Sequence, residues 1–313
     1  MKPSLKKLSE QVVVVTGASS GIGLATARAA ARAGARVVLA CRSEHAMPAI
    51  IERIRAEGGE AFFVPCDVAH RDQVEAVARA AVQRYGRIDT WVNNAGVTIY
   101  GRLADVSEED SRRLFDINFW GVVHGSLCAL PHLKRNGGAL INVGSEVSEA
   151  VVPLQGMYAA SKHAVKGFTD ALRVEIEDVD PAPVSITLIQ PTAVDTPYPQ
   201  HARNYMDREP KLPSPRINPE DVATAILRAA EHPTRQKRIG LMAKLNTATA
   251  KLAGGMADTI SAGYVKRQHY EESPRHPEGA LYQPSEAVGV VGRTRGTGGR
   301  TKGFTRRTSG RRR

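Results

Sequence analysis

The apolar positions of the chain fall into short continuous runs that alternate with longer segments of helical periodicity. Residues 12–15 are four consecutive valines that no polar residue interrupts. A strand buried on both faces of a parallel sheet has this pattern, because neither face meets water. A glycine-rich turn follows, and then an alanine-rich stretch, residues 24–33, which ends at Gly34. This order predicts a strand, a turn and a helix.

The same unit repeats along the first 190 residues. Further strands are predicted at residues 36–40, 61–64, 90–93, 139–143 and 184–189, and helices between them at 46–57, 71–85, 109–130 and 157–177. Strands that alternate with helices of this length indicate an α/β fold of the Rossmann type, a doubly wound parallel sheet flanked by helices. Ligands of such a sheet bind at the carboxyl ends of its strands.

The alternation ends after residue 189, where the chain becomes rich in proline. Residues 191–218 hold Tyr198 and Tyr205 among these prolines, and we expect this segment to form a loop that covers a substrate. Residues 218–233 return to helical periodicity, with Asn218 placed to cap the helix and a proline at its first position. We assign the loop and this helix to the same domain as the sheet.

Beyond this helix the apolar pattern weakens in two steps. Residues 241–268 predict one or two amphipathic helices, interrupted by a pair of glycines. From Ser273 onward proline, glycine, serine and arginine dominate and the periodicity is lost, as in segments too polar to bury a core. We therefore expect one folded domain over residues 1–272, with a C-terminal helical extension, and a disordered tail over residues 273–313.

The formal net charge of +11 belongs mostly to this tail. Nine of the lysines and arginines lie in residues 292–313, where there is no acid, so the rest of the chain carries only +2. A basic tail can contact nucleic acid or an anionic membrane, but a solvated extension is the simpler interpretation. The folded part of the chain is nearly neutral and does not have the charge of a nucleic-acid-binding protein.

Neither the N-terminus nor the cysteines indicate export. The first ten residues are charged and include no apolar leader, and no run of 18 apolar residues exists. Cys41, Cys66 and Cys128 have no C-x-x-C spacing, which indicates reduced thiols rather than a disulfide or a zinc site. We therefore expect a cytoplasmic protein without a metal. The amphipathic residues 241–268 leave peripheral membrane association as an alternative.

The turn after the first strand, TGASSGIG, carries the first chemical signal. It places Gly17, Gly21 and Gly23 between a strand and a helix. Glycines at such positions let the backbone turn sharply and approach a pyrophosphate, which then lies at the positive end of the helix. A tight turn without a ligand is the alternative for the motif alone. The strand before it and the helix after it favour nucleotide binding.

A second signal stands at the end of the second strand, where folds that select NAD usually have an acid bonded to the adenosine ribose. This chain has Cys41 there, followed by Arg42 and Ser43. A guanidinium suits the charge and the geometry of a phosphate. We therefore predict a preference for NADP(H), with Arg42 at the 2′-phosphate and Ser43 assisting it. Glu44 is the competing acid, and NAD(H) is the alternative cofactor.

A third signal is the pair Tyr158 and Lys162, which stand four residues apart in a predicted helix and so project from one face. A free tyrosine has a pKa near ~10. A nearby ammonium and the positive charge of an oxidised nicotinamide both favour the phenolate and lower that pKa. The pair can therefore provide a general acid for carbonyl reduction and a general base for alcohol oxidation.

Further motifs occur in order between residues 10 and 200: CDV at 66–68, NNAG at 93–96, DINFWG at 116–121 and YAASK at 158–162. Together with the glycine turn, this set resembles the short-chain dehydrogenase/reductase family, in its NADP-preferring type. The resemblance implies an oxidoreductase that interconverts a ketone, aldehyde or quinone and an alcohol by hydride transfer. It also implies a homodimer or homotetramer built through the helices that contain Asn118 and Tyr158.

The resemblance implies a catalytic tetrad of Asn118, Ser145, Tyr158 and Lys162. Ser145 would bond the substrate oxygen and stabilise the charge that develops there, and Asn118 would support a proton relay through water and Lys162. Ser148 is the competing serine, but Ser145 has the family's spacing to the tyrosine. A nucleotide-sensing protein without catalysis is the alternative function, and the intact tetrad argues against it.

The resemblance also implies which residues line the two parts of the site. Besides Tyr158 and Lys162, the residues expected to bind the cofactor are Gly17, Ser19, Ser20, Gly21, Ile22, Gly23, Arg42, Ser43, Asp67, Val68, Asn94, Ala95, Gly96, Pro191, Thr192, Val194 and Thr196. The residues expected to shape the substrate pocket are Glu146, Val152, Leu154 and Tyr198. Apolar residues dominate this part of the sequence, which favours a hydrophobic carbonyl substrate.

Overall fold

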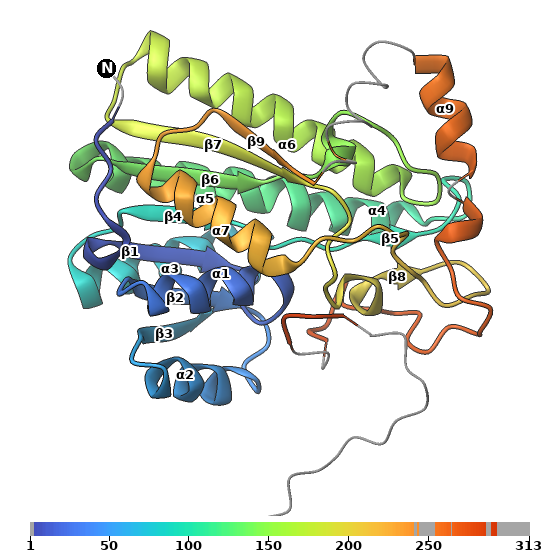
Figure 1. Ribbon diagram of the computed structural model, residues 1–313, viewed down its shortest axis with the longest axis horizontal. Coiled ribbons are helices and arrows are strands. Elements are labelled where there is room, and N and C mark those ends of the chain that lie inside the picture. The colour runs from blue at the N-terminus through green and yellow to red at the C-terminus, as the bar shows by residue number, and fades with distance from the viewer. Residues whose placement is uncertain (1–2, 241–242, 244–253, 264, 286–288, 293–313) are drawn as a thin grey trace, which may run out of the picture.

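The computed structural model of the chain describes residues 3–240, 243, 254–263, 265–285 and 289–292. Its core is a parallel sheet of seven strands in the order β3-β2-β1-β4-β6-β7-β9 (Figure 1). The strands are β1 (Val12–Thr16), β2 (Arg36–Cys41), β3 (Glu60–Pro65), β4 (Thr90–Asn93), β6 (Gly138–Val143), β7 (Val184–Pro191) and β9 (Gln236–Ile239). The predicted Rossmann-type α/β fold is confirmed.

Helices cover both faces of this sheet (Figure 1). One layer holds α1 (Gly21–Arg32), α2 (Met47–Ala56) and α7 (Pro219–Glu231), and the other holds α3 (Arg71–Tyr85), α4 (Glu108–Phe115), α5 (Gly121–Asn136) and α6 (Gly156–Val174). Val13 and Val15 of β1 pack on the first layer, and Val12 and Val14 pack on the second. The run of valines is uninterrupted because both faces of the strand are buried.

The structure differs from the prediction in two helical segments and in one strand that the sequence pattern does not predict. The helix predicted over residues 109–130 is divided into α4 and α5 by a π-helical turn, η2 (Asp116–Trp120), and α6 continues into a second π-helical turn, η4 (Glu175–Val179). The apolar pattern does not predict β9, whose sequence is QKRI. This strand pairs only with β7 at the edge of the sheet, so most of its side chains are only partly buried and carry no apolar signal.

A buried polar cluster joins strands β4 and β6 to helices α5 and α6. Asn93 Nδ2 donates to Asn142 Oδ1 at 2.9 Å and to Ser126 Oγ at 3.1 Å, and Asn142 Nδ2 donates to Thr169 Oγ1 at 2.9 Å. All four side chains are buried. An unpaired polar group would be costly here, so these bonds hold the helices in one register against the strands.

The proline-rich segment after β7 forms the expected loop. It contains a short 3₁₀ helix, η5 (Tyr198–His201), and a two-residue strand, β8 (Arg203–Asn204), which pairs with β5 (Ile99–Tyr100). This pairing holds the loop over the carboxyl ends of the central strands. In the described part of the chain, no helix is long and apolar enough to cross a bilayer.

Residues 277–285 and 289–292 form a segment that we call the C-terminal strap. After α9 (Gly254–Gly263) and η6 (Val265–Arg267), the chain runs back past β8 towards the carboxyl ends of the strands (Figure 1). The side chain of Leu281 is completely buried in the core on the α3–α6 side of the sheet.

The strap differs from the disorder expected beyond Ser273. A few apolar side chains, the Tyr282 hydroxyl and several main-chain hydrogen bonds hold it, and none of these contacts produces a periodic pattern in the sequence. The basic residues 293–313 lie outside the described residues, as does most of the segment between β9 and α9, where amphipathic helices are predicted.

Candidate active site

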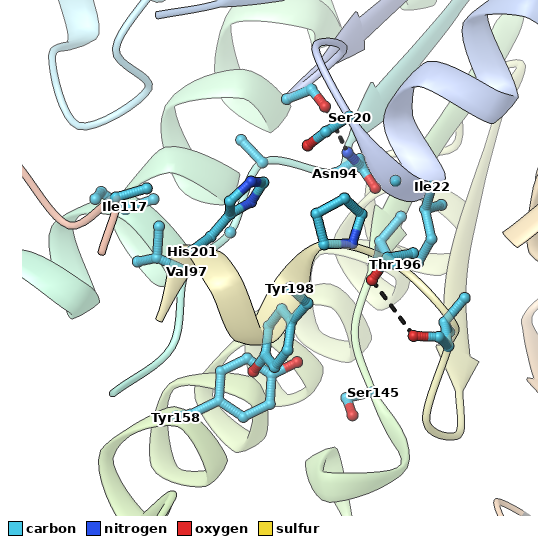
Figure 2. Close-up of a pocket in the computed structure, with 18 of the residues that line it drawn as sticks. Ser20, Ile22, Asn94, Val97, Ile117, Ser145, Tyr158, Thr196, Tyr198 and His201 are labelled. Carbon is cyan, nitrogen blue, oxygen red and sulfur yellow. Dashed lines mark hydrogen bonds between the residues drawn. The ribbon is translucent and has the colours of Figure 1, made fainter. Parts of the chain in front are cut away.

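A cavity of about 260 Å³ lies at the carboxyl ends of the strands, beside β1 and β4. The strand order reverses between these two strands, and doubly wound sheets bind their ligands at such a point. Most of the predicted site residues line it, and Figure 2 shows several of them facing one space. They are Gly17, Ser19, Ser20, Gly21, Ile22, Arg42, Ser43, Asp67, Val68, Asn94, Ala95, Gly96, Ser145, Glu146, Val152, Tyr158, Lys162, Pro191, Thr192, Val194, Thr196 and Tyr198.

Three predicted site residues do not line the cavity. Gly23 lies behind the glycine turn, where a Cβ atom would come within 2.2 Å of the Gly17 carbonyl oxygen, so its role is to let helix α1 approach the turn. Asn118 is completely buried in the π-helical turn η2. Leu154 has φ +66° and its carbonyl accepts from the Gly101 N–H at 2.9 Å, so it supports the loop and does not shape the pocket.

Thr16 and Asn94 hold the glycine turn against the end of β4. Thr16 Oγ1 accepts from the N–H groups of Asn94, at 3.0 Å, and Ala95, at 3.1 Å, while Asn94 Nδ2 donates to the Thr16 carbonyl at 2.9 Å. Gly17 has φ +66°, and a Cβ atom there would lie 2.8 Å from the Ala95 Cα. The turn is therefore fixed in a shape that only glycine can adopt.

The cavity suits an extended nucleotide carrying negative charge. The glycine turn brings the amino-terminal end of α1 to its wall, and the positive end of a helix favours a phosphate. Arg42 lines the same cavity as Tyr158 and Lys162 and supplies a further cation. Among the described residues, no three His, Cys, Asp or Glu side chains gather as a metal site.

Asn118 Oδ1 and Lys162 Nζ both lie close to Gly96. Asn118 Oδ1 accepts from the Val97 N–H at 2.8 Å, and its Nδ2 donates to the Val97 carbonyl at 3.0 Å and to Ser161 Oγ at 3.1 Å. Lys162 Nζ donates to the Val143 carbonyl at 2.9 Å. The Asn118 side chain is thus occupied in positioning the strand ends around Lys162.

Ser145, not Ser148, presents its hydroxyl to the cavity. The two serines form a capping box around the 3₁₀ turn η3 (Glu146–Ser148), in which Ser145 Oγ accepts from the Val147 N–H and Ser148 Oγ accepts from the Ser145 N–H. Ser148 is buried beneath this turn and only Ser145 lines the cavity. The geometry therefore favours Ser145 of the two serines considered.

Burial raises the pKa of Tyr158, and hydrogen bonds from the hydroxyls of Tyr198 and Ser145 oppose the rise, while the Glu146 carboxylate adds to it. Lys162 Nζ lies 5.7 Å from the centre of the Tyr158 ring. Burial also lowers the pKa of Lys162, to about 8. In the protein without its cofactor the pKa of Tyr158 is thus raised, because desolvation outweighs the neighbouring donors, and a lowering with an oxidised nicotinamide bound stays a prediction.

Arg42 also lines the cavity, and its side chain has partners that the sequence does not predict. Its Nη1 lies 3.9 Å from Asp67 Oδ2, and the same oxygen accepts a closer hydrogen bond from Arg113 Nη2. Arg42 also donates to three carbonyls of the C-terminal strap. Asp67, expected beside the adenine ring, is thus ion-paired with Arg113, a residue that the motifs do not indicate.

Several lining residues escape the sequence motifs. The cavity also contains Val97, Val147, Gln155, His201, Leu212, Pro213, Ala280, Pro284 and Ser285. His201, Leu212 and Pro213 belong to the proline-rich loop, whose general role is predicted but whose contacts are not. Ala280, Pro284 and Ser285 belong to the strap, for which the sequence offers no signal.

Known proteins match this chain in sequence and in structure. The profile of the family described as short chain dehydrogenase matches residues 11–207. An uncharacterised oxidoreductase of Bacillus subtilis (strain 168), YxnA, is 44% identical over 286 residues, which cover 90% of this chain and 80% of YxnA.

Two solved structures are similar to this one. A short chain dehydrogenase/reductase from Burkholderia phymatum in complex with NAD is 28% identical, with a TM-score of 0.72 over 82% of this chain and 97% of that one. An alcohol dehydrogenase from Thermococcus sibiricus, complexed with 5-hydroxy-NADP, is 29% identical, with a TM-score of 0.64 over 73% of this chain and 94% of that one.

Proposed function

Because this chain belongs to the short-chain dehydrogenase/reductase family of oxidoreductases, we propose that it uses NADP(H) to interconvert a carbonyl compound and an alcohol. The observation that carries this proposal is one cavity with a glycine turn at its nucleotide end and with Ser145, Tyr158 and Lys162 together in its wall. The cofactor supplies or accepts the hydride when bound, so the protein has to orient the substrate and move one proton.

Tyr158 is the proton-transfer group of this proposal. Its hydroxyl gives a proton to the carbonyl oxygen during reduction and recovers one from the alcohol during oxidation. Ser145 donates a hydrogen bond to the same oxygen and stabilises the negative charge that develops on it. Lys162, fixed by the Val143 carbonyl, holds positive charge beside the tyrosine and favours the phenolate.

Arg42 supports the choice of NADP(H). It stands directly after β2, where an acid would favour NAD(H). Asp67, the acid close to it, is paired with Arg113 and so is poorly placed to accept hydrogen bonds from a ribose. The NAD complex of the Burkholderia protein and the 5-hydroxy-NADP complex of the Thermococcus protein show that similar folds bind either nucleotide.

The substrate in this proposal is hydrophobic. Val97, Ile117, His201, Tyr158 and Tyr198 lie together in the cavity (Figure 2). Val152, Leu212 and Pro213 extend the apolar wall. Such a wall binds a lipid, steroid-like, quinone or aromatic carbonyl better than a small sugar, because burying apolar surface supplies the affinity. Turnover confined to small polar sugars would contradict this part of the proposal.

Tyr158→Phe tests the reaction. In a panel of hydrophobic ketones and aldehydes, we expect the wild-type protein to oxidise NADPH and the variant to lose about 10²–10⁴-fold in kcat. NADPH binding, followed by its fluorescence, should change little, because the substitution removes only a hydroxyl. A variant that retains turnover would exclude Tyr158 as the proton donor. A wild-type protein that binds NADPH and reduces no member of the panel would favour a nucleotide sensor.

We also propose a homo-oligomer formed through η2, α5 and α6. Trp120 and Leu127 are large apolar side chains that are 49% and 47% exposed on this side of the molecule, and Val174 is 45% exposed at the end of α6. Apolar side chains that gather on one surface are typical of an interface. Light scattering of the purified protein would show a mass of two or four chains, and Leu127→Asp should reduce it.

A further inference from the structure

We propose that the C-terminal strap is part of the cofactor site: its carbonyls at residues 280–282 hold Arg42 in position for the 2′-phosphate and thereby set the preference for NADP(H) over NAD(H). This inference rests on the proposed function. It assigns a specificity-determining role to residues that lie beyond the family match, which ends at residue 207.

The strap carbonyls bind the Arg42 guanidinium directly. Nη1 donates to the carbonyls of Leu281 and Tyr282, each at 3.2 Å, and Nη2 donates to the carbonyl of Ala280. A guanidinium has five N–H groups in a fixed planar fork. Within the described part of the chain the three carbonyls account for three of them, which leaves two donors, including the one on Nε, for a phosphate. The strap therefore fixes the plane of the guanidinium and leaves part of it open to the ligand.

The charges around Arg42 favour an anion. Arg42, Asp67 and Arg113 form a cluster with a formal charge of +1, and their side chains are only 20%, 16% and 14% exposed. Arg113 Nε also donates to the Leu281 carbonyl at 3.3 Å, so the strap orients both cations. Partial burial strengthens the attraction for a phosphate over that in water. The ribose hydroxyls of NAD(H) would gain much less from this positive charge.

Residues 280–282 of the strap are each held by a contact of their own. The Leu281 side chain is completely buried among the core residues. The Tyr282 hydroxyl donates to Asp110 Oδ1 at 2.9 Å, and the Ala280 N–H donates to the His201 carbonyl at 2.8 Å. The three residues whose carbonyls hold Arg42 are thus each anchored to another part of the molecule. Loosening one anchor should let the Arg42 side chain rotate away.

The strap also reaches the glycine turn. The Gly21 N–H donates to the Gly289 carbonyl at 2.8 Å, and the Gly292 N–H donates to the Asp195 carbonyl at 3.4 Å. Gly21 and Arg42 both line the cavity, so the described residues of the strap contact its wall at two places. Its placement is therefore determined at both ends of the nucleotide part of the site.

Nucleotide binding to the full-length chain tests this role without using catalysis. The ratio of the dissociation constants of NAD⁺ and NADP⁺ is measured by calorimetry for the wild type, Tyr282→Phe and Leu281→Ala. The ratio for 5′-AMP and 2′-AMP is measured beside it as a probe of the phosphate alone. We expect Tyr282→Phe to lower both ratios about fivefold, because one hydrogen bond to a charged group is lost, and Leu281→Ala to lower them at least as much.

Tyr205→Phe is the matched control. Its hydroxyl donates to Asp110 Oδ2 at 2.7 Å, on the same carboxylate, but Tyr205 belongs to the proline-rich loop and not to the strap. Its ratios should stay within about twofold of the wild type. Arg42→Ala provides the second control, because Tyr282→Phe should have no further effect on the ratio when Arg42 is absent.

Each result decides between the proposals. A wild type with a ratio near one would contradict both the NADP(H) preference and the role of the strap. A high wild-type ratio that survives both Tyr282→Phe and Leu281→Ala would overturn the role of the strap alone. So would an equal effect of Tyr282→Phe with and without Arg42. If Leu281→Ala fails to fold, Tyr282→Phe still decides, because its side chain is 42% exposed and only its hydroxyl is removed.

Discussion

Tyr198 shows how one residue outside the motifs adjusts the reacting group. Its ring packs edge-on against Tyr158 with 5.6 Å between the ring centres. Its hydroxyl hydrogen-bonds Tyr158 and lies 3.5 Å from Gln155 Oε1. Glu146, Ser145, Lys162 and Tyr100 are further polar or charged groups near Tyr158. Tyr198 therefore contributes one of the two hydrogen bonds that oppose the effect of burial on Tyr158.

Replacing Tyr198 by Phe should change the pH profile in a defined direction. Without its hydrogen bond the pKa of Tyr158 rises further, since desolvation is less opposed. Alcohol oxidation needs the phenolate, so the rising limb of kcat against pH should move to higher pH. Carbonyl reduction needs the protonated form and should persist to higher pH.

Tyr100→Phe is the control for this measurement. Tyr100 is completely buried, and within the described part of the chain its hydroxyl has no hydrogen-bond partner. Its removal should leave both limbs in place. A Tyr198→Phe profile that is unchanged, or that moves to lower pH, would contradict a role of Tyr198 in setting the Tyr158 pKa.

At the scale of the residue, the sequence predicts which side chains reach the site better than it predicts the surroundings that set their pKa values. The spacing of Tyr158 and Lys162 predicts that both reach one site, and both line the cavity. The direction of the Tyr158 pKa depends on burial and on Tyr198, which contacts it only in the folded chain. Asn118 is predicted as a member of the site, but its buried amide is satisfied by Val97 and Ser161.

At the scale of the element, the buried polar cluster fixes the strands against the helices behind them. Asn142→Leu should destabilise the protein by about 2–3 kcal/mol, because it leaves the Asn93 amide and the Thr169 hydroxyl with fewer partners in an apolar layer. Urea unfolding followed by circular dichroism measures this change. Asn136→Leu, at the exposed end of α5, should shift the free energy of unfolding by less than about 0.5 kcal/mol.

The central strands and most helices are predictable because each has a regular apolar face. The alternation of strands and helices predicts a parallel sheet with right-handed crossovers, but it does not predict the order of the strands, because doubly wound sheets occur in more than one order. The π-helical turn at Asn118 is not predictable in this way, because one extra residue in a helix leaves the composition unchanged. The edge strand β9 also has no apolar pattern, because its side chains are only partly buried and most of them are polar.

At the scale of the whole molecule, two truncations separate the strap from the basic tail. A chain that ends at residue 272 lacks Leu281 and the carbonyls that bind Arg42. We expect it to lose more than tenfold in NADPH affinity and about 2–5 kcal/mol in stability, as when a large buried side chain is removed. A chain that ends at Gly292 lacks the tail cations and should retain both properties.

Calorimetry and thermal unfolding of the two truncated chains measure these effects. The loss of apolar periodicity after Ser273 predicts that both truncations are harmless. The contacts of the strap predict instead that only the truncation at Gly292 is harmless. Equal behaviour of the two chains would show that the strap contributes neither to the fold nor to the nucleotide site.

The strap also places a condition on when the site is completed during synthesis. Arg42 is separated by about 240 residues from the carbonyls that hold it, whereas the sheet is built mainly from neighbouring strand–helix units. Polypeptides fold progressively from the N-terminus as they leave the ribosome. The Rossmann core can therefore form while residues 280–282 are still untranslated. In our proposal, selection of NADP(H) over NAD(H) is therefore acquired after the core that binds the nucleotide has formed.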